Sequence, residues 1–221
     1  MKLQHHHYTR TAYALSISAA FLYCLWFLGY ILNSKAMANL DVSALQSVGQ
    51  PYYGFFVIGD IATGVLVILL AACLIKIFHR TQINKRISFW LCILGLLAFG
   101  IMTATASIFP SCDSDSSYCV LNLSEVFNVH NITGTIASFG QFISVITALK
   151  LVYKNITKSV FWTTIGLLIL WAISGLVFIT LSTNSFHSSL LMQHLFLVLS
   201  SVLLVIVPWV LIKFRPTKGT S

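Results

Sequence analysis

Three ionisable residues lie inside otherwise apolar stretches of the sequence, and they are the first candidates for chemistry. Asp60 lies in the second stretch, His130 begins the fourth, and His194 lies early in the sixth. Ionisable groups are costly inside a membrane, so they usually face the interior of a helix bundle and mark a site. At a helical rise of about 1.5 Å per residue, each lies about 5–10 Å from the same end of the bundle. We therefore expect the three side chains to share one layer.

One Asp and two His form a donor set that suits zinc or another transition-metal ion, with a position left for water. Metal-bound water is acidic enough to attack an ester or an amide, so Asp60, His130 and His194 predict a metal-dependent intramembrane hydrolase as one hypothesis. The three come from separate stretches, and the sequence has no H-x-x-x-H or H-E-x-x-H cluster.

The same layer also suits a lipid headgroup or a small amphipathic ligand, with Asp and His as hydrogen-bond partners. A proton-coupled carrier with Asp60 as its titrating group is a further alternative. Carriers often have internal repeats and helices broken by Gly or Pro, whereas the predicted spans contain one proline, Pro208, near the end of the last. The carrier hypothesis is therefore disfavoured.

The fourth apolar stretch carries a polar stripe at helical spacing. A lipid-facing stripe would leave hydrogen-bond donors unsatisfied, so this helix should be central, and its small residues should let neighbours approach closely. The stripe and its neighbours are His130, Gly134, Ala137, Gln141 and Ser144, with Asn131, Thr135 and Ser138 adjoining. For Gln141, Ser144 and Thr147 we favour hydrogen bonds between helices. The candidate ligand-binding residues are Asp60, Asp113, His130, Asn131, Gln141, His187 and His194.

The elements that must position these residues are membrane-spanning helices. The chain is 57% hydrophobic and 8% charged, against about 25% charged residues in a soluble domain. A helical span needs roughly 20 apolar residues, which predicts spans over residues 12–32, 54–78, 87–109, 127–153, 160–181 and 189–212. The expected fold class is an all-α integral membrane protein: a six-helix domain at 12–212 between tails at 1–11 and 213–221.

Basic residues predict the orientation of this bundle. They gather at both termini and in the second and fourth connections, whereas Lys35 is the one basic residue in the other connections. Short loops rich in Lys and Arg stay cytoplasmic, so we expect both termini in the cytoplasm and the chain in the inner membrane. The formal charge of +8 thus indicates topology and contact with membrane lipids, with no nucleic acid as a partner.

Two cysteines lie on the opposite side, in the third connection. Cys112 and Cys119 have six residues between them, and an extracytoplasmic compartment is oxidising in most cells. We expect a disulfide between them. A redox-active pair is the alternative, although such pairs are more typically C-x-x-C.

The segments Phe109-Pro110-Ser111-Cys112-Asp113 and His130-Asn131-Ile132-Thr133-Gly134 resemble the "F-P-x-D … H-N-x-x-G" pattern of the bacterial and archaeal family called domain of unknown function 998. Six spans and the chain length also fit that family. The resemblance implies that Phe109, Pro110, Asp113, His130 and Gly134 are the positions to test, although wider spacing leaves Asp113 and Asp115 as alternatives for the acidic position. The family implies no activity.

A looser similarity links the chain to six-span lipid-associated proteins of the Frag1/DRAM type. A still looser one links it to intramembrane zinc hydrolases such as alkaline ceramidases, whose seventh span and H-x-x-x-H pair are missing here. We expect a protein that binds or handles a lipid or small amphipathic ligand in a polar chamber built by the second, fourth and sixth spans and open to the outside. The alternatives are the Asp/His/His metal hydrolase, for which zinc would be the cofactor, and a non-catalytic accessory subunit.

Overall fold

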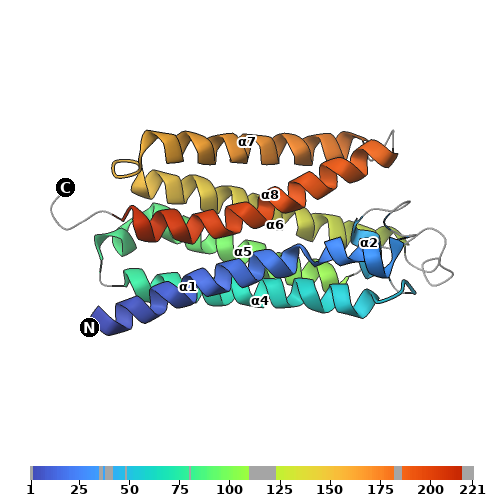
Figure 1. Ribbon diagram of the computed structural model, residues 1–221, viewed down its shortest axis with the longest axis horizontal. Coiled ribbons are helices and arrows are strands. Elements are labelled where there is room, and N and C mark those ends of the chain that lie inside the picture. Colours follow the sequence, from blue (N-terminus) through green and yellow to red (C-terminus); the bar gives the residue numbers. More distant parts are fainter. Residues whose placement is uncertain are drawn as a thin grey trace.

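The computed structural model describes residues 2–34, 37, 42–47, 49–79, 81–109, 123–181 and 186–215. Helix is the regular structure of these residues, and Figure 1 shows the helices lying side by side along one axis. The elements in chain order are α1 (Lys2–Tyr23), η1 (Leu25–Leu28), α2 (Gly29–Leu32), η2 (Val42–Gln46), α4 (Tyr53–Phe78), η3 (Gln82–Lys85), α5 (Ile87–Ile108), α6 (Leu123–Val152), α7 (Lys158–Leu181) and α8 (Phe186–Lys213), where η denotes a 3₁₀ helix.

Among the described residues, six segments are long and apolar enough to cross a membrane, which confirms the expected all-α, six-span fold class. They are His6–Leu32, Tyr53–Phe78, Ile87–Ile108, Val129–Val152, Lys158–Thr180 and Leu190–Lys213. The first helix begins at Lys2, ahead of the predicted boundary at residue 12. A helix already nucleated by its apolar part extends at little cost through polar residues, and the Thr11 hydroxyl donates to the His7 carbonyl at 3.0 Å along this extension.

The bundle is built from consecutive antiparallel neighbours. α5 packs between α4 and α6, α1 packs on α4 and α8, and α6 contacts α8. α7 packs mainly on α8 and touches α6 little; in Figure 1 it forms the upper edge of the bundle. The loose α6–α7 pairing leaves a boundary that the other helices do not close.

Paired glycines set the close packing of α4, α5 and α6. A Cβ on Gly100 would lie 2.7 Å from the Gly64 carbonyl oxygen, and one on Gly140 would lie 2.6 Å from the Gly95 carbonyl oxygen. Small residues of this kind let membrane helices approach backbone to backbone. The expectation that the helix with the polar stripe is central and closely packed is confirmed for α6.

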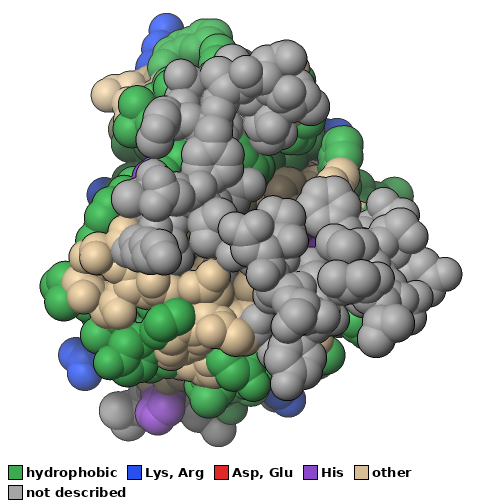
Figure 2. Space-filling view, turned by 90° about the vertical axis from the view of Figure 1, so that its right-hand side faces the viewer, with side chains coloured by type: hydrophobic (Ala, Val, Ile, Leu, Met, Phe, Trp, Pro, Cys, Tyr) green, Lys and Arg blue, Asp and Glu red, His purple; other side chains and the backbone are tan. Residues whose placement is uncertain are grey.

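The two ends of the bundle differ in character. The start of α1 and the end of α8 lie at one end of the bundle, which we call the terminal end, and η2 lies at the opposite end, which we call the η2 end (Figure 1). Toward the terminal end, apolar side chains from the long helices fill the interior, among them Leu74, Phe89, Val145 and Leu211. Viewed from the η2 end, the Lys and Arg side chains in sight lie at the outline of the molecule (Figure 2).

The first span is broken close to the η2 end. α1 stops at Tyr23, and η1 follows as a 3₁₀ segment, a geometry that is tighter than the α-helix and often marks a functional position within a span. The Cys24 sulfur at the break lies 3.1 Å from the Ser201 hydroxyl of α8. This break carries Trp26 into the interior, where it is 5% exposed.

Candidate functional site

A cavity of about 980 Å³ lies in the half of the bundle nearer the η2 end. This volume is at the upper end of the range for small-molecule sites, about 300–1,000 Å³. All six spans and η2 contribute to its walls. The polar and titratable side chains that line it are Tyr23, Gln46, Asp60, Thr103, His130, Asn131, Thr135, Ser138 and Gln193.

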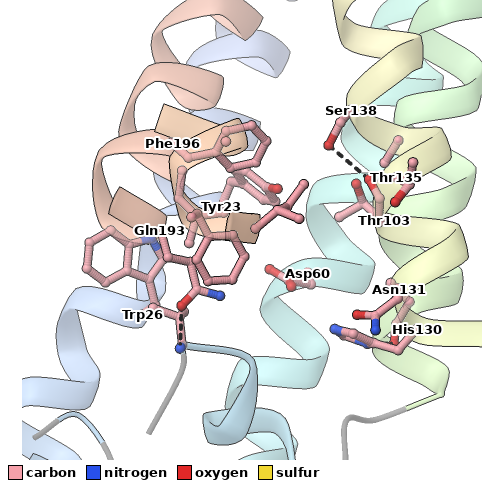
Figure 3. Close-up of a pocket in the computed structure, with 18 of the residues that line it drawn as sticks. Tyr23, Trp26, Asp60, Thr103, His130, Asn131, Thr135, Ser138, Gln193 and Phe196 are labelled. Carbon is pink, nitrogen blue, oxygen red and sulfur yellow. Dashed lines mark hydrogen bonds between the residues drawn. The ribbon is translucent and has the colours of Figure 1, made fainter. Parts of the chain in front are cut away.

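Asp60 is the charged residue in the polar part of this cavity. Its Oδ2 accepts a hydrogen bond of 2.6 Å from the Gln46 side-chain amide and one of 3.3 Å from the Ser107 hydroxyl. Both partners are neutral and buried. Figure 3 shows the Asp60 carboxylate directed into the space between α1 and α8 on one side and α5 and α6 on the other.

The short helix η2 lines the cavity near the η2 end and is tied to two spans. Gln46 bonds Asp60 of α4, and the backbone N–H of Val42 donates to Gln193 Oε1 of α8 at 2.9 Å. Val42 and Leu45 also pack in a small buried cluster with Trp26 and other apolar side chains. These contacts hold η2, with the Gln46 amide, against the Asp60 carboxylate.

His130 lies across the cavity from Tyr23 and Trp26 (Figure 3). Its Nδ1 lies 2.9 Å from the Ala106 carbonyl oxygen and 3.1 Å from that of Phe109. Carbonyl oxygens only accept, so Nδ1 must carry the proton, which leaves Nε2 as the acceptor in the neutral ring. His130 therefore satisfies carbonyl groups at the end of α5 and still presents a polar ring to the cavity.

The polar stripe of α6 divides into two parts. Asn131, Thr135 and Ser138 line the cavity. Gln141 does not, because its amide donates to the Ser200 carbonyl of α8 at 2.6 Å. The Ser144 hydroxyl lies 3.0 Å from the Cys92 carbonyl oxygen of α5. The preferred interpretation of hydrogen bonds between helices is confirmed for Gln141 and Ser144. Ligand binding by Gln141 stays a prediction, although Gln141 is not among the residues that line the cavity.

His194 is not among the residues that line the cavity, so the structure does not bring it together with Asp60 and His130 there. Its ring stacks on Trp26 with centroids 4.3 Å apart, and its Nδ1 lies 3.4 Å from the Tyr30 hydroxyl oxygen. Counting residues placed His194 near the η2 end, but the rotation of α8 turns it behind Trp26.

The proposed metal ligands consequently do not form a metal site. Within the described ranges, no three His, Cys, Asp or Glu side chains lie close enough to hold one ion together. Asp60 is bonded to Gln46 and Ser107, and His130 Nδ1 is bonded to the end of α5. The Asp/His/His zinc hypothesis is therefore corrected.

Some predicted residues fall outside the described parts of the chain. These are Asp113, Asp115, Cys112 and Cys119, so the expected disulfide and the acidic loop position stay predictions. The side chain of His187 is likewise outside the description.

Several cavity residues escaped the sequence analysis. Tyr23 and Trp26 look like ordinary interfacial aromatics, and Gln193 is a single amide in an apolar span. Gln46 belongs to a loop whose return into the bundle leaves no periodic signal. Trp26 also has a buried Nε1–H without a hydrogen-bond partner among the described residues, which is uncommon in folded proteins.

The far wall of the cavity is apolar and reaches the outer surface between α6 and α7. Phe139 and Phe142 of α6 and Leu176 and Ile179 of α7 line the cavity. Phe139 is 63% exposed, Leu176 64% and Ile179 63%. Since the two helices touch little, the cavity opens sideways, toward the region that lipid chains would fill.

Residues 16–210 match a family described as Protein of unknown function (DUF998). Neither the comparison with curated proteins nor the comparison with solved structures found a match.

Proposed function

Because the chain belongs to the DUF998 family, whose description names no activity, we propose its function from the cavity: it binds a lipid or small amphipathic molecule within the membrane. The polar end of the ligand lies near Asp60 and His130, and its apolar part extends between α6 and α7. The observation that carries this proposal is a single cavity with a polar part at the η2 end and an apolar side opening.

The lining matches an amphipathic ligand in three respects. Polar groups gather around Asp60, whereas Phe139, Phe142 and Leu176 make the side opening apolar. The unpartnered Trp26 Nε1–H is a donor that a ligand oxygen would satisfy. Toward the terminal end, the interior is filled by apolar side chains such as Leu74 and Leu211, which supports a one-sided binding chamber over a pathway through the bundle.

The orientation and compartment follow as a second part of the proposal. Lys76, Lys85, Lys150, Lys158 and Lys213 lie at or near the helix ends of the terminal end. The positive-inside rule therefore favours cytoplasmic termini in an inner membrane, with the cavity in the outer half. Reporter fusions to the C-terminus test this, and a C-terminal reporter active only on the extracytoplasmic side would contradict it.

With cytoplasmic termini, Cys112 and Cys119 would lie on the extracytoplasmic side and form a disulfide. Free thiols at both cysteines in natively purified protein would contradict the disulfide.

Gly134→Phe tests the binding proposal by partly filling the cavity. Gly134 lines the cavity, and a Cβ there would meet nothing within 4 Å. Gly166 of α7 is exposed and equally open, so Gly166→Phe is a matched control with the same added side chain outside the cavity.

Native mass spectrometry of the three proteins should find a retained lipid or amphiphile in wild type and in Gly166→Phe, and reduced occupancy in Gly134→Phe. Equal occupancy in all three, or none in wild type, would defeat the binding proposal. An accessory subunit without a ligand predicts the latter result.

A further inference from the structure

The charge of the cavity restricts the ligand further. Asp60 is the one formally charged residue among the residues that line the cavity, and none of them is Lys or Arg. The basic residues within the long helices α4 and α6, Lys76 and Lys150, lie in the last turns of these helices at the terminal end. A ligand in the cavity therefore meets one carboxylate and, within the described part of the chain, no compensating cation.

The hydrogen bonds of Asp60 leave half of its carboxylate available. Both protein donors, the Gln46 amide and the Ser107 hydroxyl, go to Oδ2. Oδ1 accepts no hydrogen bond from the residues that the structure describes. Neutral donors orient the carboxylate without neutralising it, and a buried charge is costly unless it is paired.

The faces of several rings around the cavity suit a cation. Tyr23, Phe56 and Phe196 line it, and aromatic faces attract ammonium groups. Trp26 is different, because its ring stacks on Phe27 and His194; it contributes its free Nε1–H instead.

We propose that the ligand is an amphiphile whose polar end carries a protonated or quaternary amine, with Asp60 as its counter-ion. This inference rests on the proposed function, since it specifies the polar end of the same ligand. An anionic headgroup would be repelled by Asp60, and a neutral one would leave the carboxylate unpaired. The ammonium group can belong to a free organic cation or to a membrane lipid headgroup.

The test uses three probes that share one brominated chain: ω-bromoundecyl-trimethylammonium, ω-bromoundecanol and ω-bromoundecanoate. Bromine quenches tryptophan fluorescence on contact, and Trp26 and Trp171 line the cavity. The full chain is placed in nanodiscs of digalactosyldiacylglycerol, a lipid with no amine and no net charge, because an anionic bilayer would itself concentrate the cationic probe. Each probe is titrated against wild type, Asp60→Asn and Asp60→Glu. A Trp26→Phe/Trp171→Phe protein, whose remaining tryptophans do not line the cavity, reports quenching by the surrounding membrane.

The ammonium probe should quench wild type saturably, with a midpoint about tenfold or more below that of the alcohol, as expected for an ion pair with Asp60 beside aromatic rings. Asp60→Asn should remove this preference without changing the alcohol midpoint, and Asp60→Glu should retain it. Brominated phosphatidylcholine in the nanodisc then identifies the source of the ammonium group. Quenching of Trp26 and Trp171 by this lipid indicates a lipid headgroup, and the absence of such quenching indicates a free cation.

Equal midpoints for the ammonium and alcohol probes in wild type would overturn the inference while leaving the binding proposal intact. This comparison needs no variant, so it holds even if Asp60→Asn fails to fold. If no probe quenches wild type saturably, the binding proposal fails together with the inference.

Discussion

Replacing Gln46 by Leu removes the shorter hydrogen bond to the Asp60 carboxylate and keeps a side chain of similar size. The Gln46 amide lies 2.6 Å from Oδ2, and the remaining donor, Ser107, lies 3.3 Å away and also bonds the Thr103 carbonyl. Hydrogen bonds to charged groups contribute about 1.5–3 kcal/mol, so Gln46→Leu should lower the free energy of unfolding by that amount.

The loss should be concentrated in η2. Its second anchor, from the Val42 N–H to Gln193, stays in place together with the buried Leu45, so η2 should open locally while the bundle persists. A cost of about 1.5–3 kcal/mol raises the equilibrium constant for the opening of η2, and with it the hydrogen-exchange rate, by about tenfold to a hundredfold. Hydrogen exchange of the amides of residues 42–46 measures this in nanodiscs.

Two controls make the result specific. Gln82 of η3 is exposed at the terminal end, and Gln82→Leu should change the free energy of unfolding by less than about 0.5 kcal/mol. Combining Gln46→Leu with Asp60→Asn should cost less than the sum of the two single changes, because both act on the same bond: the first removes its donor and the second removes the charge of its acceptor. Unchanged exchange in η2 and additive costs would refute the role assigned to this bond.

Three further changes test other contacts. Gly140→Leu should destabilise the bundle by about 3 kcal/mol or more, because the side chain would meet the backbone of α5 and overpacking is costly. Gly166→Leu, whose side chain meets open space, should not destabilise it, and equal thermal unfolding of the two variants would contradict the glycine packing. His130→Ala should cost about 1 kcal/mol and speed hydrogen exchange at the end of α5, and protection as in wild type would argue against its bonds to those carbonyls. Gln141→Leu should lower the free energy of unfolding by about 0.6 kcal/mol, the average for hydrogen bonds between membrane helices, because its hydrogen bond to Ser200 is lost. The variant should leave quenching by the ammonium probe unchanged, and weaker quenching would indicate that Gln141 belongs to the ligand site.

The sequence by itself determined the spans of the fold. Continuous apolar length and helical spacing are local properties of the chain, so the six spans and the polar face of α6 could be read from hydropathy and period alone. Depth could be read as well, since counting residues along a helix measures distance along its axis. Asp60 and His130, which this counting grouped together, both line the cavity.

The tertiary structure alone decided which residues at that level meet. Direction depends on how each helix is rotated about its axis, and this rotation follows from packing against segments far away in the chain. His194 is therefore turned behind Trp26, whereas Gln193, its neighbour, lines the cavity and holds η2. The return of Gln46 onto Asp60 and the side opening between α6 and α7 likewise arise from pairings between distant segments, which local hydropathy does not record.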